Sequence, residues 1–267
     1  MYETTAARRQ PEIGVEGPLE RLRAEAGQAL AIAIKDVRVY YLTPPMVMFG
    51  LLMPFFMFFS FSVGRGMGQE ASLARLLALT TFFTASSAGP VILPMERRVR
   101  TFDRLLVAPV SLISVLLGKS LVGTFFGLAV AMVPLVGGLL AFGVRIADPL
   151  LLAAALLGSS LAFAALGILF GSVPAQNPGS IMMPSTLVRW PLLFISGVFI
   201  PLREMDPWAR ALSYASPLTY AQDLFDYAVS GAGVQGAGLD LVVLPALLAL
   251  FLLGALKLHG LSRRMGY

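Results

Sequence analysis

The 267-residue sequence contains no cysteine and only one histidine, His259. The absence of cysteine excludes disulfides, thiol catalysis and thiolate metal sites, and a single histidine argues against imidazole metal clusters and Ser-His triads. Charge is also scarce, because Asp, Glu, Lys and Arg make up 13% of the residues while 57% are hydrophobic. Soluble domains carry about 25% charged residues. The composition therefore indicates an all-α integral membrane protein.

The net charge of +5 does not indicate binding to nucleic acid. The cations lie in clusters beside apolar runs, without the interleaved aromatic residues on which bases stack. A charged leader of about 40 residues precedes the first apolar run. Because this layout differs from that of a cleaved secretory signal, we expect the first span to remain in the membrane as an anchor.

Six apolar segments are long enough to cross a hydrocarbon core about 30 Å thick as helices. They cover approximately residues 43–63, 72–94, 110–142, 149–173, 179–201 and 239–261. The chain is thus divided into a cytoplasmic leader, residues 1–42, and a six-span transmembrane domain, residues 43–267. Within the leader, apolar positions at helical spacing over residues 19–42 predict an amphipathic helix in the membrane interface, with an ordinary soluble helix as the alternative.

Lysine and arginine indicate the orientation of the spans, since they accumulate in cytoplasmic loops. Thirteen of them flank the span ends on one side, and five flank the ends on the other. Both termini and the loop after the second span are therefore predicted to be cytoplasmic. Residues 202–238 form the longest external segment, and its aromatic first half predicts short re-entrant helices at or within the outer leaflet, before the sixth span.

Three features resemble sites of chemistry. The stretch LGKS, residues 117–120, resembles the end of a P-loop, but Ile113 stands where that motif needs glycine. The chain therefore has no ATP site of its own.

Asp223 and Asp226 could be metal ligands of a prenyl-transferring enzyme, but no second acidic cluster completes such a site, and we interpret them as exposed carboxylates. Arg189, in the fifth expected span, is a candidate intramembrane functional charge unless its side chain reaches an interface.

The fourth expected span contains a GxxxG pair, Gly167 and Gly171. Small residues at this spacing allow two membrane helices to approach closely. Packing within one subunit and packing between two subunits explain the pair equally well at this point.

The most unusual stretch is PMERRVRTFDRLLVAPVS, residues 94–111, which places an arginine-rich block between apolar runs. A topology signal needs only cations, so Glu96 and Asp103 would be superfluous in it. The block also has an apolar stripe at helical spacing, made of Val99, Phe102, Leu105 and Leu106. A short amphipathic cytoplasmic helix of this kind fits a groove on a partner protein. Topology signal and docking helix both remain open from composition alone.

This block and a later one resemble a known family. The first comprises Glu96, Arg97, Thr101, Leu105, Leu106, Pro109 and Gly118–Lys119. The second comprises residues 196–201 (SGVFIP), 205–208 (MDPW) and 216–220 (SPLTY). In this order and within six spans, the blocks are similar to signatures of ABC-2 type transporter permeases. The sequence departs from the pattern at Arg100, where the family has glycine, and at Asp226, where many relatives have arginine.

The resemblance implies the permease subunit of an ATP-driven exporter in the cell membrane, paired with a second permease, expected as a homodimer. Two separate cytoplasmic ABC ATPase subunits would bind ATP and Mg²⁺, and this chain would hold no cofactor or metal. A coupling helix after the second span would contact the ATPase through Glu96, Arg97, Arg98, Arg100, Thr101, Phe102, Arg104 and Leu105. An external gate would include Pro201, Trp208, Pro217 and Tyr220.

The transported substrate is expected to be hydrophobic or amphipathic, because the spans are rich in Phe, Leu and Met. A drug, a lipid, a glycolipid and a polysaccharide all remain open. The alternatives to an exporter are the integral scaffold of an ATP-driven importer, an enzyme acting on polyprenyl lipids, and a non-enzymatic membrane assembly protein. The external SGVFIP and SPLTY stretches favour the exporter over the importer scaffold.

Overall fold

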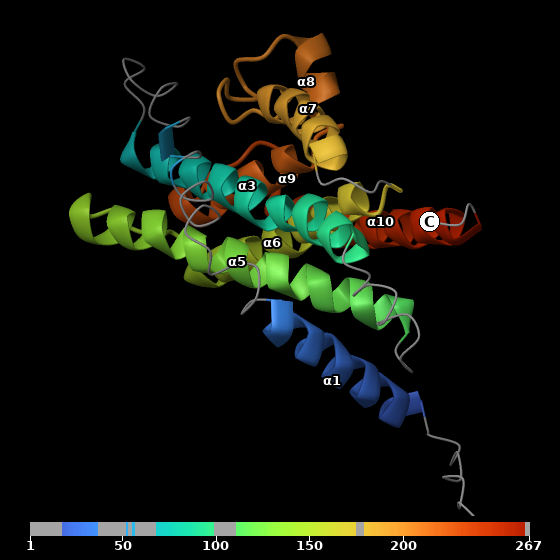
Figure 1. Cartoon of the computed structure of the whole chain (residues 1–267). Coiled ribbons are helices and arrows are strands. Elements are labelled where there is room, and N and C mark those ends of the chain that lie inside the picture. Colours follow the sequence, from blue (N-terminus) through green and yellow to red (C-terminus); the bar gives the residue numbers. More distant parts are fainter. Residues whose placement is uncertain are drawn as a thin grey trace, which may run out of the picture.

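The computed structural model describes residues 18–36, 52, 55–56, 68–98, 111–174 and 179–264, and within these residues the regular structure is entirely helical (Figure 1). The all-α prediction is confirmed for this part of the chain. The helices are α1 (Pro18–Asp36), α3 (Gln69–Arg98), α5 (Leu112–Ala141), α6 (Pro149–Gly171), α7 (Gly179–Ile195), α8 (Pro207–Ser213), α9 (Pro217–Ser230) and α10 (Ala237–Arg264).

Four of these helices, α3, α5, α6 and α10, are long and apolar enough to cross a membrane. They coincide with the expected spans at residues 72–94, 110–142, 149–173 and 239–261. The expected first span, residues 43–63, lies outside the described residues apart from short helical pieces at Leu52 and at residues 55–56. The structure thus accounts for four of the six expected spans.

Helix α7 covers only part of the fifth expected span, residues 179–201. It has 17 residues, and at 1.5 Å per residue this corresponds to a length of about 26 Å. The chain leaves the helix at Ser196–Gly197, where Gly197 adopts a positive φ of 89° that other residues rarely adopt. The apolar run therefore continues past Ile195 as a turn, which sequence hydropathy does not distinguish from helix.

The helix starts are fixed by side-chain caps. Asp148 accepts a hydrogen bond from the backbone N–H of Leu151 (3.0 Å), and Ser216 accepts one from that of Leu218 (3.3 Å). Both caps are followed by proline at the first helical position, where the missing N–H would have no intrahelical partner in any case. The starts of α6 and α9 are therefore set by local sequence.

Helix α3 lies at the centre of the bundle. In its most apolar window 89% of the residues are buried, against 17% in α10, and α3 contacts α5, α6 and α9. Hydroxyls along α3 donate to carbonyls one turn back, as Thr81 does to Leu77 O (2.8 Å) and Ser86 to Phe82 O (2.5 Å). This bonding satisfies polar groups within an apolar environment without any partner from another helix.

Helices α3 and α6 approach backbone to backbone through glycines. A Cβ added at Gly167 would lie 2.5 Å from the carbonyl oxygen of Ser86, and one added at Gly89 or Gly171 would overlap the backbone of the facing glycine. The GxxxG pair therefore serves packing within one subunit. Of the two explanations left open by the sequence, the structure supports this one.

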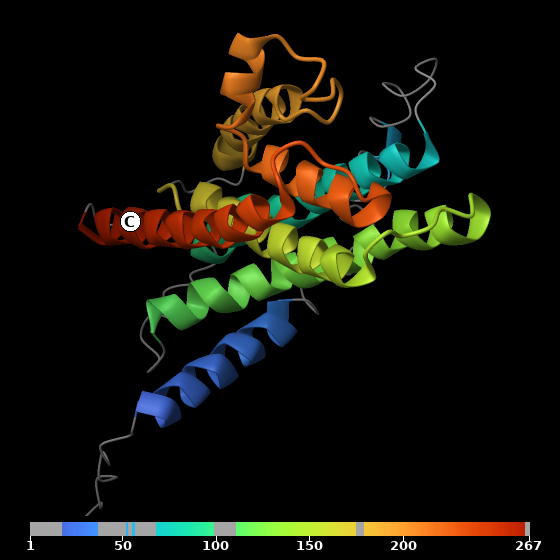
Figure 2. The ribbon, with the colours of Figure 1, turned by 180° about the vertical axis from the view of Figure 1, so that it is seen from behind.

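Helix α1 packs along α5 on one side of the bundle, and α7 and α8 project from the other side (Figures 1 and 2). Ile32 and Ala33 of α1 are buried against the bundle, while Leu30 and Ile34 are 56% and 49% exposed. One face of α1 thus contacts protein and another presents apolar side chains outward. This matches the predicted amphipathic helix as far as Asp36, and residues 37–42 lie outside the described part.

At each end of the bundle, segments from different parts of the chain come together. At one end, Asp148 N–H donates to Ala228 O (2.9 Å), which joins the α5–α6 connection to the end of α9. At the other end, Arg97 reaches residues 172–173 after α6 and His259 near the end of α10. The first end contains segments expected to be external, and the second contains segments expected to be cytoplasmic.

Candidate functional site

The last turn of α3 contains the three described residues of the expected ATPase contact: Glu96, Arg97 and Arg98. Their side chains differ in environment. Arg98 is exposed, Arg97 is half-buried and Glu96 is fully buried. The remaining five predicted contact residues, Arg100, Thr101, Phe102, Arg104 and Leu105, lie outside the described residues. Of the described three, Arg98 is the most exposed.

Arg97 fastens the end of α3 to two other helices. Its guanidinium donates to the carbonyl oxygens of Val173 (2.8 Å) and Ser172 (3.3 Å), just after α6, and lies 3.1 Å from Nδ1 of His259 in α10. Carbonyls at a helix C-terminus lack intrahelical donors and carry partial negative charge, so an arginine is well suited to them. Arg97 therefore bonds within the chain, whereas the sequence placed it in a partner contact.

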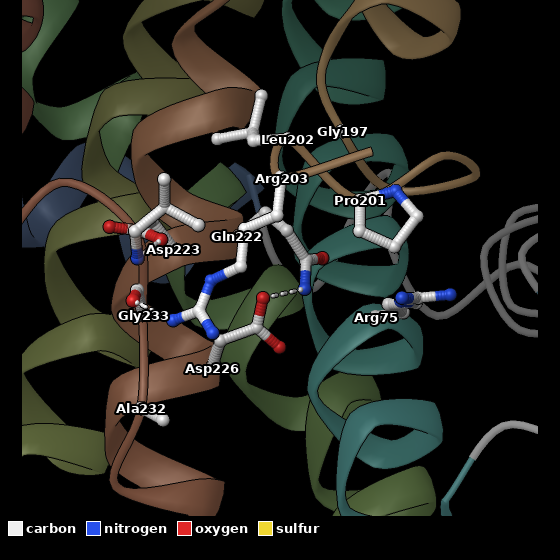
Figure 3. A pocket seen from close by; sticks show the side chains of 11 residues that line it. Arg75, Gly197, Pro201, Leu202, Arg203, Gln222, Asp223, Asp226, Ala232 and Gly233 are labelled. Carbon is white, nitrogen blue, oxygen red and sulfur yellow. Dashed lines mark hydrogen bonds between the residues drawn. The ribbon is translucent and has the colours of Figure 1, made fainter. Parts of the chain in front are cut away.

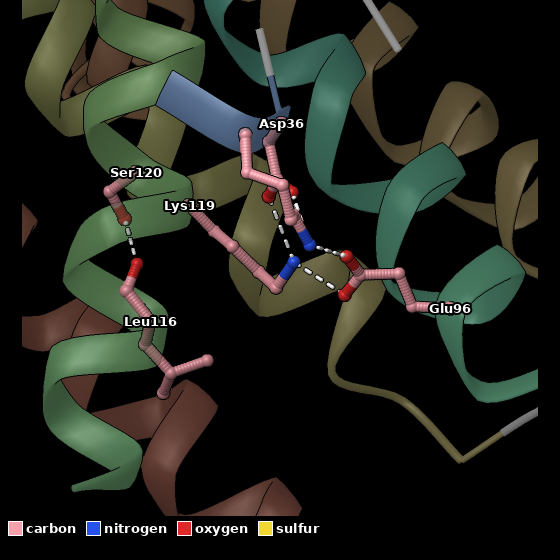
Figure 4. Close-up of polar contacts among 6 residues, drawn as sticks. Asp36, Glu96, Leu116, Lys119 and Ser120 are labelled. Carbon is pink, nitrogen blue, oxygen red and sulfur yellow. Dashed lines mark hydrogen bonds and ion pairs between the residues drawn. The ribbon is translucent and has the colours of Figure 1, made fainter. Parts of the chain in front are cut away.

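Glu96 lies in a buried cluster of four charges that we call the charge clasp: Lys35 and Asp36 of α1, Glu96 of α3 and Lys119 of α5 (Figure 4). Lys119 Nζ lies 3.0 Å from Asp36 Oδ2 and 2.5 Å from Glu96 Oε2. Lys35 Nζ lies 2.7 Å from Asp36 Oδ1 and 2.9 Å from Glu96 Oε1. Each cation therefore contacts both carboxylates, and the cluster is neutral overall.

Burial makes this pairing obligatory for three of the four groups. The side chains of Asp36 and Glu96 are completely buried, and that of Lys119 is 1% exposed, whereas that of Lys35 is 43% exposed. A buried charge without a partner is strongly destabilising. Burial by itself would lower the pKa of Lys35, but its hydrogen bonds to Asp36 and Glu96 outweigh this and raise the pKa. Lys35 thus remains a cation that completes the clasp.

Sequence reasoning missed the clasp. The sequence pattern assigns Lys35 to the cations that indicate the orientation, Lys119 to an incomplete P-loop and to the family signature, and no role to Asp36. The available signal was a lysine in the first third of an apolar span, because a charge at such a position requires a counter-ion. Choosing that counter-ion requires knowing that α1 folds back along α5, and apolar periodicity does not specify such packing.

The four expected gate residues occupy different positions on the other end of the molecule. Pro201 follows α7, Trp208 is 71% exposed on α8, and Pro217 is buried at the first position of α9. The hydroxyl of Tyr220 on α9 donates to Tyr214 O (3.0 Å), after α8. Helices α8 and α9 are short, as predicted, but α9 is deeply buried against α3, α6 and α10.

A cavity of about 110 Å³ lies between α9, the start of α3 and the loops after α7 and α9 (Figure 3). Its polar lining consists of Arg75, Arg203, Gln222, Asp223 and Asp226. Gln222 Nε2 donates to Asp226 Oδ2 (3.0 Å). Burial raises the pKa of Asp226 to about 6, although the bond from Gln222 and the charge of Arg75 act in the opposite direction.

The interpretation of Asp223 as an exposed carboxylate is wrong. Asp223 is 2% exposed, and its two oxygens accept hydrogen bonds from the backbone N–H groups of Val234 (2.6 Å) and Gln235 (2.8 Å). These bonds hold the glycine-rich turn before α10 against α9. The error arose because the polar side of α9 was assumed to face water, whereas it faces this loop.

Arg189 lies inside the protein, 6% exposed. Its guanidinium donates to the carbonyl oxygen of Ser86 (2.8 Å) and to the hydroxyl of Ser87 (3.4 Å) on α3, and it lies 5.8 Å from the ring centre of Phe170 on α6. The side chain therefore points into the bundle. Its contacts connect α7 to α3, the central helix.

Comparison with known proteins agrees with the family resemblance of the sequence. Residues 27–229 match the family described as ABC-2 type transporter. The chain is also similar to the daunorubicin resistance ABC transporter permease protein DrrB1 of Streptomyces coeruleorubidus, with 34% identity over 90 residues. That alignment covers 33% of this chain and 30% of the relative. The family match extends from α1 to α9 and includes all four residues of the charge clasp.

Proposed function

Because the chain belongs to the ABC-2 type transporter family, we propose that it is the permease subunit of an ATP-driven exporter in the cytoplasmic membrane. The observation that carries the proposal is the family match over residues 27–229, to which the four long apolar helices add a membrane location. The chain is a membrane transport subunit in which no ATP-binding domain is indicated. ATP and Mg²⁺ would therefore be bound by a separate ATPase, present in two copies beside a homodimer of this chain.

The proposed ATPase contact begins at Arg98 and continues through Arg100, Thr101, Phe102, Arg104 and Leu105. Arg98 supports this assignment, because it is exposed at the end of α3 beside Met95, which is 45% exposed. Glu96 and Arg97 belong to the support of this contact and not to its surface, since both bond within the chain. The contact would thus follow a helix end that is bonded to α1 and α5 through Glu96, and to α6 and α10 through Arg97.

The proposed route for the substrate runs between two copies of the permease. Exposed apolar side chains of α7, such as Met183 (80%) and Leu187 (74%), support an outward face suited to lipid, a second subunit or an amphipathic substrate. Pro201, Trp208, Pro217 and Tyr220 would form the external gate, and Arg189 would be an intramembrane charge beside the route. The drug-resistance name of the relative supports a drug among the candidate substrates, and a lipid, glycolipid or polysaccharide remains within the proposal.

Purification of the tagged chain in detergent, after co-expression with a candidate ABC ATPase, tests the proposal. We expect a stable complex that hydrolyses ATP and is inhibited by vanadate. Charge reversal at Arg98 and Arg104 should release the ATPase while the permease remains folded. Charge reversal at Arg145, which we expect on the opposite side of the membrane, is the matched control and should leave the complex intact. Retention of the ATPase by the Arg98 and Arg104 variant would overturn the contact assignment.

A further inference from the structure

We propose that the charge clasp couples the interfacial helix α1 to the cytoplasmic ends of α3 and α5, so that force applied after Arg98 moves the three helices together. This inference rests on the proposed function and adds positioning residues to it. Lys119, Asp36 and Glu96 would act through the helices they connect, without touching the substrate or ATP. The following features support the inference.

The clasp joins three separate parts of the chain at one point. Lys35 and Asp36 end α1, Glu96 lies in the last turn of α3, and Lys119 lies in the second turn of α5. The charges alternate around the ring, because each cation contacts only carboxylates and each carboxylate contacts both cations. Displacing any one helix would therefore break at least two ion pairs at once.

Gly118, next to Lys119, allows α1 to lie directly against α5 beside the charge clasp. A Cβ at Gly118 would lie 2.6 Å from the carbonyl oxygen of Ala29 and 3.1 Å from Cβ of Ile32. The backbone of α1 therefore sits directly on α5, and the salt bridge from Lys119 to Asp36 closes one turn further along α1. Close packing and ion pairing at adjacent residues fix both the distance and the register of the two helices.

Glu96 and Arg97 extend this connection in two directions. Glu96 faces α1 and α5 through the clasp, whereas Arg97 bonds to the carbonyls after α6 and lies beside His259 of α10. The segment after Arg98 is thus attached to a helix end that is fastened to four other helices. Movement of this segment by a bound ATPase would be transmitted to α1 and α5 through Glu96, and to α6 and α10 through Arg97.

Stability alone does not account for a buried ring of this kind. Replacing buried ion pairs by apolar residues of similar volume is often neutral or stabilising, because taking charges out of water is costly. What paired charges add is a defined geometry that an apolar contact lacks, since an apolar contact tolerates sliding. A variant that lacks one charge of each sign and still folds should therefore lose the coupling between ATP hydrolysis and transport.

The absence of cysteine from the natural chain makes a direct test available. The variant Asp36→Cys/Lys119→Cys removes one charge of each sign and leaves Lys35 paired with Glu96. It is assembled with the ATPase, reconstituted in vesicles and assayed for ATP hydrolysis and transport before and after treatment with a short bis-maleimide cross-linker. Ala26→Cys/Leu121→Cys, at exposed positions on the same two helices, is the matched control.

Before cross-linking we expect ATP hydrolysis to continue while transport per ATP falls about tenfold, within the usual range of coupling between sites. Cross-linking should restore transport, and the control should be unaffected by either step. Normal transport by the uncross-linked variant, or failure of the cross-link to restore it, would overturn the inference. If the cysteine pair does not assemble, Asp36→Asn/Lys119→Gln and Lys119→Arg replace it, with uncoupling expected for the first and near-normal coupling for the second. Absence of ATP-driven transport by the unmodified chain would instead refute the proposed function.

Discussion

The contact between α3 and α6 provides the sharpest stability prediction, through Gly167→Ala. A Cβ at Gly167 would lie 2.5 Å from Ser86 O and 2.9 Å from Ser86 C, whereas ordinary van der Waals contact begins at 3.4 Å. Both atoms belong to the backbone of the central helix, so no side-chain rotation relieves the overlap. The two helices would have to move apart along a buried interface.

The expected cost of this substitution is at the upper end of the range for overpacking, about 3 kcal/mol. For chains of this size about 2–4 °C of melting temperature corresponds to 1 kcal/mol, so the midpoint should fall by roughly 6–12 °C. The assay is thermal denaturation of the detergent-purified protein, followed by size-exclusion chromatography of the tagged chain.

Gly158→Ala is the matched control, because it lies on the same helix and its added Cβ would meet only Leu244 Cδ1, at 3.8 Å. This variant should melt with the unmodified protein or slightly above it, since alanine favours helix over glycine. Equal midpoints for Gly167→Ala and Gly158→Ala would refute the close approach of α3 and α6.

Three further predictions concern the polar contacts around α7 and α9. Ser216→Ala removes the N-cap of α9 and the hydrogen bond from the Ser216 hydroxyl to Leu192 O. The free energy of unfolding should fall by about 0.5–2 kcal/mol, seen as a lower melting temperature. Ser230→Ala, on the exposed end of α9, is the control and should change the melting temperature little. Burial raises the pKa of Asp226 from 3.8 to about 6, so the folded state binds this proton more tightly than the unfolded state does. Stability should therefore decrease as the pH rises through this window. Between pH 4 and 7 the melting temperature of Asp226→Asn should depend less on pH than that of the unmodified protein. Arg189→Met removes the guanidinium bonds to Ser86 O and the Ser87 hydroxyl, so the free energy of unfolding should fall by about 1.5–3 kcal/mol, the range for hydrogen bonds of a charged group. The folded variant should also lose transport, and retained transport would remove Arg189 from the proposed route.

Much of the fold follows from the sequence, because long apolar runs with prolines and capping residues at their starts set the boundaries of α5 and α6. The end of α7 could not be predicted, since it depends on the conformation of Gly197 within a continuous apolar run. The burial of α9 was also missed. Its hydrophobic face was visible in the sequence, but the space for it between α3, α6 and α10 is a property of tertiary packing.

The candidate site was predicted only in part. The arginine-rich block drew attention by composition, yet composition does not reveal that Glu96 and Arg97 turn inward while Arg98 turns outward. Those directions depend on where Lys119, Asp36 and the carbonyls after α6 lie in space. Composition therefore indicated the end of α3 as a candidate site, and three-dimensional packing sets the surroundings of each described side chain there.

ATP-dependent uptake into inverted membrane vesicles tests the central claim most directly. Vesicles containing the chain and its ATPase, with the cytoplasmic face outward, are supplied with ATP and a fluorescent amphipathic cation, a fluorescent phospholipid or a labelled oligosaccharide lipid. The account predicts that at least one of these probes accumulates inside with ATP, and that vanadate or charge reversal at Arg98 and Arg104 stops the accumulation. ATP-driven movement of a probe out of these vesicles, or ATP hydrolysis by the intact complex without movement of any probe, would contradict it.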